Sequence, residues 1–565
     1  MQTSSLKREP AETSVRLSNP HANTHNARRR ASRGALIALA CAVFLPQLAS
    51  CNLIVDASAE QCETDADCAA MGGAFSGSLC TAKHVCGRAS CSSNAQCSQR
   101  FGEPGYCRPT DSTCSKLLTE DCTSVFPADG LNAGDAIVLG FMGPLRGQFA
   151  SVGVPLKQGA ELALNEIETR ANGLPPVGDG PQRHVVMLAC HDLDDPKRAA
   201  RHLVDEVQVP AILGPAFSGV TVQVTTDVTV PGQVLTVSAS ATSPDITSLK
   251  DNGLVWRTVP SDIIQARPLA ELVLKVEGVL RDEGVLGASE SARIAIAAKD
   301  DAYGLGLADA VFGQMKAQGV AAAVSPALLL RRNYPDPASN PNFDWDTLAA
   351  EVSRFAPHIV FGLGTNEFAM ELLTRVEAGW GSGTRPRYLL PEGGKVEELE
   401  GIVANQPDLS ARILGTVPGA QLATGYPGFA SRFKAFFNEP PGTFSEFAYD
   451  AAYLLVYSVG ITRQAHPSGR QMADGMQQLT CEGGSVVPAG PSDFTGFFNT
   501  AMQSQCIDFD GVSGPLDFDN ATGDAPSDIA IWCAWRTGSS VTLEAQAAYF
   551  SAADGLIKGD VAFCP

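Results

Sequence analysis

Cations are scarce in this sequence, and long apolar runs are absent after its first 50 residues. Lys and Arg number 41 against 61 Asp and Glu, which gives a formal net charge of −20 over 565 residues. Nucleic-acid binding requires clustered cations that neutralise phosphates, so this balance argues against such a role. No stretch after residue 50 approaches 18 uncharged apolar residues, so we expect no membrane-spanning helix there.

Common signatures of catalytic and metal sites are also missing. The eight histidines form no pair with metal-ligand spacing, and no Gly-x-Ser-x-Gly elbow surrounds Ser218, which argues against a hydrolase. Gly304-Leu305-Gly306 is followed by Asp309 where a dinucleotide-binding loop requires its third glycine. No nucleophile–base pair is evident. We therefore expect a protein that is not an enzyme, with no catalytic residues, no metal and no cofactor.

The first 51 residues have the composition of an export signal. Four arginines within 28–33 precede an apolar run over 35–45, which is too short to span a bilayer. The segment ends in Leu48-Ala49-Ser50-Cys51, which resembles the lipobox of bacterial lipoproteins. This resemblance implies a signal peptide over 1–50, lipid on Cys51, and a bacterial protein anchored to a periplasm-facing or cell-surface membrane. An ordinary signal peptide with a chance cysteine is the alternative.

Fourteen of the 16 cysteines remain once Cys41 in the predicted signal and Cys51 are set aside. Eight of them form two tandem units within 62–114, Cys62, Cys68, Cys80 and Cys86 in the first and Cys91, Cys97, Cys107 and Cys114 in the second. Units of about 25 residues are too small for a sufficient hydrophobic core, so two disulfides in each would stabilise them. Zinc is the alternative, but no Cys-x-x-Cys pair is present.

The six remaining cysteines lie outside this cluster. Four occur near the end of the chain and can form two more bridges, Cys481, Cys506, Cys533 and Cys564. Cys122 and Cys190 are then left to pair with each other. An even number of cysteines in an exported chain favours disulfides throughout. We expect the cluster to be flanked by a tether over 51–61 and a linker over 115–133.

From residue 134 to 565 the chain alternates short apolar runs, small-residue turns and helix-like stretches. The runs are Ala136–Met142, His184–Ala189, Ala211–Leu213, Val234–Val237, Arg293–Ala298, His358–Leu363 and Tyr388–Leu390. This alternation requires crossover helices and therefore parallel sheets, whose ligands bind at the carboxyl ends of the strands. Two such sets predict an α/β fold of two lobes with a ligand cleft. Lobe 1 is expected to comprise about 134–262 and 424–500, and lobe 2 about 263–423 and 501–565. The late segments are expected as a helix over Phe444–Gly460 and a hairpin of Leu516–Asp519 with Ile529–Trp535.

Seven short motifs in order resemble the type I periplasmic binding proteins of the leucine/isoleucine/valine-binding family, the extracytoplasmic receptors of ABC importers. They are Gly143–Gly153, the helix around Gly159–Ala163, Asp194–Ala199, Trp256–Asp262, Asp300–Gly306, Pro391-Glu392-Gly393 and Tyr449-Asp450-Ala451. The resemblance covers Ala136–Trp535. It implies the two-lobed type I fold, here preceded by a small disulfide-rich module that simple transport receptors lack.

The same resemblance implies an amino-acid site in the cleft. Its residues would be Ser218, Ser240, Ala241 and Thr242 for the carboxylate, Glu392 for the ammonium, Tyr303 for a hydroxyl or aromatic wall, and Phe149 for an apolar wall. The alternatives are that Ser218 and Thr242 are plain helix N-caps, Glu392 a solvated loop residue and Phe149 a core aromatic. Members that bind branched amino acids have an aromatic residue near Gly364-Thr365-Asn366, where this chain has none, so a wider pocket is implied.

We therefore expect a lipid-anchored substrate-binding protein that captures a small polar ligand, an amino acid or amide, for an ABC importer. Its partners would be the small molecule, an ABC permease and, through the lipid, a membrane, but no nucleic acid. The alternative function is a surface sensor or interaction module without transport.

Overall fold

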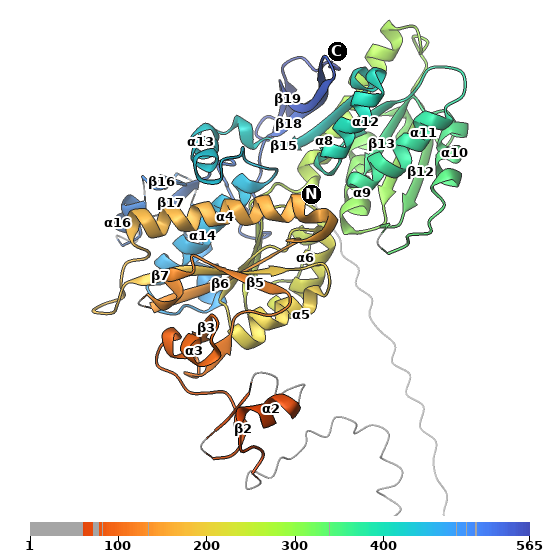
Figure 1. The fold of residues 1–565 in the computed structure, drawn as a ribbon. Helices are drawn as coiled ribbons and strands as arrows, with labels where there is room; N and C mark the ends of the chain where they lie inside the picture. Colours follow the sequence, from red (N-terminus) through yellow and green to blue (C-terminus); the bar gives the residue numbers. More distant parts are fainter. Residues whose placement is uncertain are drawn as a thin grey trace, which may run out of the picture.

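The computed structural model of the chain describes residues 60–564, with short gaps at 72–77, 82, 134, 338, 482, 493 and 503–505. The predicted signal peptide, Cys51 and nearly all of the predicted tether lie outside the described residues. Two α/β lobes follow a small cysteine-rich module (Figure 1). The predicted fold class is thus confirmed.

Lobe 1 is built on a six-stranded sheet with the order β10-β9-β8-β6-β7-β5. All neighbours are parallel except β5, which runs antiparallel to β7. The strands are β5 (Cys122–Phe126), β6 (Asp135–Gly143), β7 (Arg183–His191), β8 (Ala211–Leu213), β9 (Leu235–Ser238) and β10 (Val255–Arg257). The four apolar runs predicted in this half all form strands.

Helices cover both faces of the lobe 1 sheet (Figure 1). Ile137, Leu139 and Phe141 share one buried cluster with α4 and α14, whereas Val138 and Met142 belong to another with η4 and η5. Successive strand residues point to opposite faces, so a strand covered on both sides is apolar throughout. The helices of this lobe are α4 (Ala150–Ala171), α5 (Pro196–Arg201), η4 (His202–Val207), α6 (Ser218–Val224), η5 (Thr225–Thr229), α7 (Pro244–Thr247), α13 (Tyr426–Phe437), α14 (Ser445–Thr462), α15 (Gly469–Met476) and α16 (Phe494–Met502).

Lobe 2 has an eight-stranded sheet with the order β12-β11-β13-β14-β15-β18-β19-β20. The first five strands are parallel and the last three antiparallel. The strands are β11 (Ile294–Lys299), β12 (Leu329–Tyr334), β13 (Ile359–Leu363), β14 (Arg387–Leu390), β15 (Ile413–Pro418), β18 (Ile529–Thr537), β19 (Ser540–Ser551) and β20 (Leu556–Lys558). Its helices are α8 (Asp262–Asp282), α9 (Ala302–Ala317), η6 (Ala321–Ala323), α10 (Trp345–Phe355), η7 (Phe368–Leu373), α11 (Thr374–Gly379), α12 (Glu397–Asn405) and η9 (Pro407–Arg412).

The chain crosses between the lobes three times. The core of lobe 1 draws its residues from 137–259 and 420–525, and the cores of lobe 2 from 266–417 and 530–564. The predicted boundary at 501 is therefore wrong, because Ile507, Phe509 and Val512 pack into lobe 1. There β16 (Ser485–Pro488) pairs with β17 (Ile507–Asp510).

The predicted late hairpin is also corrected. Strand β18 pairs with β19, not with the segment Leu516–Asp519. That segment forms a tight turn instead, in which the backbone N–H of Asp519 donates to Asp524 at 2.8 Å. The predicted helix over Phe444–Gly460 is confirmed as α14.

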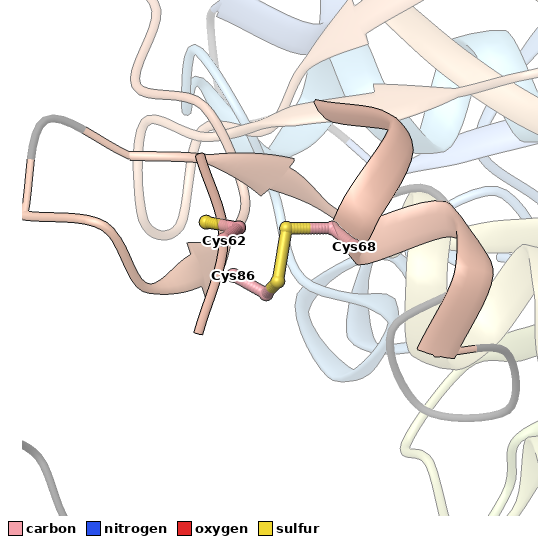
Figure 2. A group of neighbouring side chains, drawn as sticks. All are labelled: Cys62, Cys68 and Cys86. Carbon is pink, nitrogen blue, oxygen red and sulfur yellow. A yellow bond between two sulfur atoms is a disulfide. The ribbon is translucent and has the colours of Figure 1, made fainter. Parts of the chain in front are cut away.

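Each cysteine unit of the module has two internal disulfides, as predicted. The pairs join the first cysteine to the third and the second to the fourth, Cys62–Cys80, Cys68–Cys86, Cys91–Cys107 and Cys97–Cys114. Figure 2 shows the Cys68–Cys86 bridge with the Cys62 sulfur beside it. The module contains α2 (Asp65–Met71), β1 (Leu79–Cys80), β2 (Cys86–Gly87), α3 (Asn94–Phe101), β3 (Gly105–Cys107) and β4 (Cys114–Lys116).

The segment 115–133, predicted as a linker, is instead part of lobe 1. It contributes β5 to the sheet and η2 (Asp129–Asn132), and Leu117 and Leu131 are buried in the core. Cys122–Cys190 joins β5 to β7, as predicted, and the four late cysteines form two bridges, Cys481–Cys506 and Cys533–Cys564, whose pairing the sequence left open. Among the described residues, none of the helices combines the length and apolarity needed to cross a bilayer.

Candidate interlobe ligand site

A cavity of about 270 Å³ lies between the two lobes, at the carboxyl ends of their parallel strands. Five of the seven predicted ligand-binding residues line it, Phe149, Ser218, Ser240, Tyr303 and Glu392. Ala241 and Thr242 are fully buried behind this wall and do not line the cavity. Lobe 1 also contributes Phe217 and Phe444, and lobe 2 contributes Lys299, Asn366 and Lys395.

On the lobe 1 side, the loops after β8 and β9 are joined by serine hydroxyls. Ser238 Oγ donates to the Pro215 oxygen at 2.7 Å, and Ser240 Oγ donates to the Ala216 oxygen at 2.8 Å. Ser218 Oγ accepts a hydrogen bond from the Ser243 backbone N–H at 3.2 Å. The hydroxyls of Ser218 and Ser240 therefore fix the geometry of the wall that they form.

Gly214 allows these loops to come together. Its φ is +105°, and a Cβ there would lie 2.1 Å from the Met142 backbone oxygen. A side chain at this position is excluded both by the backbone conformation and by the adjacent strand β6. The turn after β8 can therefore bring Ser218 to the cleft only with glycine at its start.

Neither Ser218 nor Thr242 is the N-cap of a helix, so the alternative role considered for these two hydroxyls is wrong. The N-cap of α6 is Phe217, without a side-chain hydrogen bond, and the N-cap of α7 is Ser243. Thr242 Oγ1 donates to Asp262 Oδ2 at 3.0 Å and also contacts Glu392. Thr242 therefore joins lobe 1 to the carboxylates of lobe 2.

Arg257 supports the 241–243 loop from behind. Its guanidinium is fully buried and donates to the backbone oxygens of Ala241, at 3.3 Å, and Ser243, at 2.8 Å. Two further bonds go to Asp524, from Nε at 2.6 Å and from Nη2 at 2.9 Å. Because a bidentate guanidinium–carboxylate pair has fixed geometry, Arg257 and Asp524 determine where this loop stands.

On the lobe 2 side, Glu392 follows β14 in the short turn η8 (Glu392–Gly394). Its side chain is buried and accepts a hydrogen bond from Gln265 Nε2, and the hydroxyls of Tyr303 and Thr242 lie close enough to lower its pKa. Gly393 permits this arrangement, since a Cβ there would lie 2.8 Å from the Tyr303 hydroxyl and 2.5 Å from the Gly364 oxygen. The interpretation of Glu392 as a solvated loop residue is therefore wrong.

Two buried carboxyl groups face each other beneath the cleft. Burial raises the pKa of Glu392. Burial raises the pKa of Asp262 well above its ordinary value, and the nearby charge of Glu392 raises it further. Removing two like charges from water is unfavourable, so the pair retains a proton at a higher pH than isolated carboxyls would.

Aromatic rings form the apolar wall. Phe149, at the end of η3 (Gly147–Phe149), makes an edge-to-face contact with Phe217 at 5.3 Å between ring centroids. Lys299 from lobe 2 lies 6.0 Å from the centroid of the Phe149 ring. Phe149 is thus a wall residue of the cleft and not a core aromatic.

Several residues around the cleft were not predicted from the sequence. Gln265, Asp262, Lys299 and Lys395 lie within or beneath its walls. Thr365, from the segment that lacks the expected aromatic, also lines the cavity. Only the positions of the two lysines in the sequence could have indicated a place in the cleft, because Lys299 ends a strand and Lys395 follows the motif that contains Glu392.

The fold and the cleft define a two-lobed binding protein, and sequence comparison assigns the family. The profile of the family described as periplasmic binding protein matches residues 136–531. The chain therefore belongs to the periplasmic binding proteins, as a type I member of the leucine/isoleucine/valine-binding group.

Two relatives illustrate the relationship. The Leu/Ile/Val-binding protein BraC3 of Rhizobium johnstonii is 34% identical over 197 residues, which are 34% of this chain and 47% of that protein. The leucine-, isoleucine-, valine-, threonine- and alanine-binding protein of Pseudomonas aeruginosa is 27% identical over 354 residues, or 62% and 84% of the two chains. The chain thus spans about half the length of the first relative and most of the second.

A solved structure supports the fold. The leucine-binding protein LivK from Thermotoga maritima aligns with a TM-score of 0.52 at 16% identity, covering 72% of this chain and 97% of LivK. At this identity the likeness concerns the fold alone. The cysteine-rich module lies before the matched residues 136–531.

Proposed function

We propose that this protein is an extracytoplasmic, lipid-anchored binding protein that closes its two lobes on a free amino acid for an ABC importer. The observation that carries the proposal is the buried carboxylate of Glu392 in the cleft wall. No cation among the described residues forms an ion pair with it. A buried carboxylate without a cation is costly, so an ammonium group of a ligand is its natural complement.

The other parts of an amino acid have matching surfaces. The Ser218 hydroxyl, which accepts from the Ser243 N–H and keeps its own proton to donate, suits the α-carboxylate. The Phe149–Phe217 pair suits the aliphatic part of a side chain. Two relatives bear names that state binding of leucine, isoleucine and valine. These names support an amino acid as the ligand class here, without deciding which one.

Calorimetric titration with individual L-amino acids and with their 2-hydroxy-acid counterparts tests this proposal. Because the hydroxy acids lack the ammonium, they should bind at least tenfold more weakly than the amino acids. Glu392→Gln should weaken amino-acid binding by about thirtyfold or more, since losing one partner of a buried charge pair costs about 2–5 kcal/mol. Glu351→Gln is the matched control, because Glu351 forms an ion pair with Arg332 away from the cleft. Unchanged affinity in Glu392→Gln would contradict the proposal.

The lipid anchor and the transport role rest on the Leu48-Ala49-Ser50-Cys51 motif and on the family. Deleting the protein should abolish high-affinity uptake of the ligand that the titration identifies, measured with radiolabelled ligand in cells. Normal uptake together with loss of a transcriptional response to that ligand would instead support the sensor function.

A further inference from the structure

One lysine of the cleft has no counterion among the described residues. Lys395 directly follows η8, and its backbone N–H donates to the backbone oxygen of Glu392. Its side chain is half-buried and lines both the main cavity and an adjoining pocket of about 70 Å³. Glu446 also lines that pocket, and Glu400 and Glu544 act on Lys395 through their charges, but none of the three forms an ion pair with it.

The surroundings of Lys395 are unfavourable for a bare ammonium. Burial lowers its pKa, which shows that lost hydration outweighs the attraction of the distant carboxylates. Glu446, which lines the adjoining pocket with Lys395, is a weak partner, because burial raises the pKa of Glu446 to about 7. An anionic group of a ligand beside Lys395 would restore the missing partner.

The other charges of the cleft are already accounted for. Lys299 Nζ lies 2.6 Å from Asp336 and 3.4 Å from Asp301, so its charge is neutralised within lobe 2. Glu397 and Glu398 are exposed at the start of α12, where solvent screens their charges. Among the described residues that line the cleft, Lys395 is therefore the cation that can pair with an anionic group of a ligand.

We propose that the cleft selects an amino acid whose side chain ends in a second anionic group, and that Lys395 binds this group. The inference rests on the proposed function, because it places the ligand ammonium at Glu392 and its α-carboxylate at the Ser218 wall. Val396 and Phe444 line the same cavity and would pack against the methylene groups between. Thr365 and Asn366, from the segment that lacks the expected aromatic residue, line the same cavity.

Titration of acid and amide pairs tests the inference directly. The probes are aspartate and asparagine, glutamate and glutamine, and 2-aminoadipate, with leucine for reference and lysine as a cationic side chain. At least one acidic probe should bind tenfold or more tightly than its amide or than leucine. Lys395→Met should remove this preference and leave the affinity for the neutral probes within about threefold of wild type. Lys395→Arg, which retains the charge, should keep the preference.

Lys434→Met is the matched control, because Lys434 is exposed on α13 and does not line the cleft. A thermal melt of each variant reports whether it folds, and Lys395→Arg provides the comparison if Lys395→Met does not. Leucine or lysine binding as tightly as every acidic probe, or an acidic preference that survives in Lys395→Met, would overturn the inference and leave the proposed function intact. Failure of every amino acid to bind the wild-type protein would overturn both.

Discussion

Ser243 of lobe 1 donates a hydrogen bond from Oγ to the backbone oxygen of Ala302 in lobe 2, at 2.7 Å. The contact lies beside the cleft, where α7 meets the start of α9. Gly306 of α9 lies next to it, and a Cβ there would be 2.9 Å from Pro244 Cδ and 3.0 Å from Ser243 Oγ. The lobes thus meet closely at this edge of the cleft, in a contact that an opening of the lobes would break.

Gly306→Val is therefore expected to prevent this contact and to weaken ligand binding tenfold or more, because affinity falls with the population of the closed state. The expected change is in affinity, measured by calorimetric titration, with little change in the melting temperature of the ligand-free protein. Gly313→Val is the control on the same helix, since a Cβ there meets no atom within 4 Å. Equal affinities of the two variants would contradict the role of this contact in closure.

The Arg257–Asp524 pair leads to a prediction about stability. Asp524→Asn leaves the buried guanidinium of Arg257 without its anion, which should lower the free energy of unfolding by about 3–5 kcal/mol. Asp474→Asn breaks an exposed pair with Arg470 and should cost about 1 kcal/mol or less. Urea denaturation of both variants measures the difference. Similar costs would mean that Arg257 finds other partners.

Ligand binding should release protons. Burial holds the pKa values of Asp262 and Glu392 above their ordinary range, the charge of Glu392 raises that of Asp262 further, and a ligand ammonium would lower both. Titrations at neutral pH in two buffers of different ionisation enthalpy should therefore give different apparent binding enthalpies. The difference should disappear for Glu392→Gln. Identical enthalpies for the wild type in both buffers would place the ammonium elsewhere.

Asp192 gives a prediction about pH. It is fully buried directly after β7, and burial raises its pKa to about 7, although the backbone N–H of Ala216 acts to lower that pKa. The folded protein then keeps a proton that the unfolded chain releases, so this group lowers stability as the pH rises from about 4 to 7. The loss amounts to at most about 4 kcal/mol.

Asp192→Asn should remove this pH dependence, so the variant should gain stability relative to wild type across that window. Urea denaturation from pH 4 to pH 8 measures it, with the exposed Asp205→Asn as control. A constant difference between Asp192→Asn and wild type at all pH values would show that Asp192 is ionised throughout.

Cys51→Ser tests the predicted lipid anchor. The variant should leave the membrane fraction and appear in the soluble extracytoplasmic fraction, because the thioether-linked lipid would be lost. Immunoblots of fractionated cells compare it with Ser50→Ala, which keeps the cysteine and a small residue before it. A Cys51→Ser protein that stays in washed membranes would favour an attachment other than lipid at Cys51.

Much of the fold could be predicted from local sequence. The apolar runs at Ala136–Met142 and Ala211–Leu213 become β6 and β8, because strands covered on both faces must be apolar at every position. The strands β5 and β12 carry no such run, since each lies at one edge of its sheet. They pair through backbone hydrogen bonds, to which the side-chain pattern contributes little.

That each small cysteine unit holds two internal disulfides was predictable for the same local reason. Which cysteines pair, Cys62 with Cys80 and Cys68 with Cys86, was shown only by the structure. The prediction of a linker over 115–133 was wrong, because this segment has little apolar periodicity that would indicate a strand. Its strand β5 is held in lobe 1 by Cys122–Cys190, a bridge to a strand 68 residues away.

The sequence by itself determined the two parallel-sheet lobes, the disulfide units and the motifs that carry Ser218, Tyr303 and Glu392. These features are local, because a strand, a turn or a short motif is encoded within a few neighbouring residues. Only the tertiary structure decided what surrounds them. Gln265 reaches Glu392 across 127 positions of the chain, and Arg257 reaches Asp524 across 267. The packing of distant segments determines such buried polar partners. Neither segment alone carries a periodic pattern that would predict the contact.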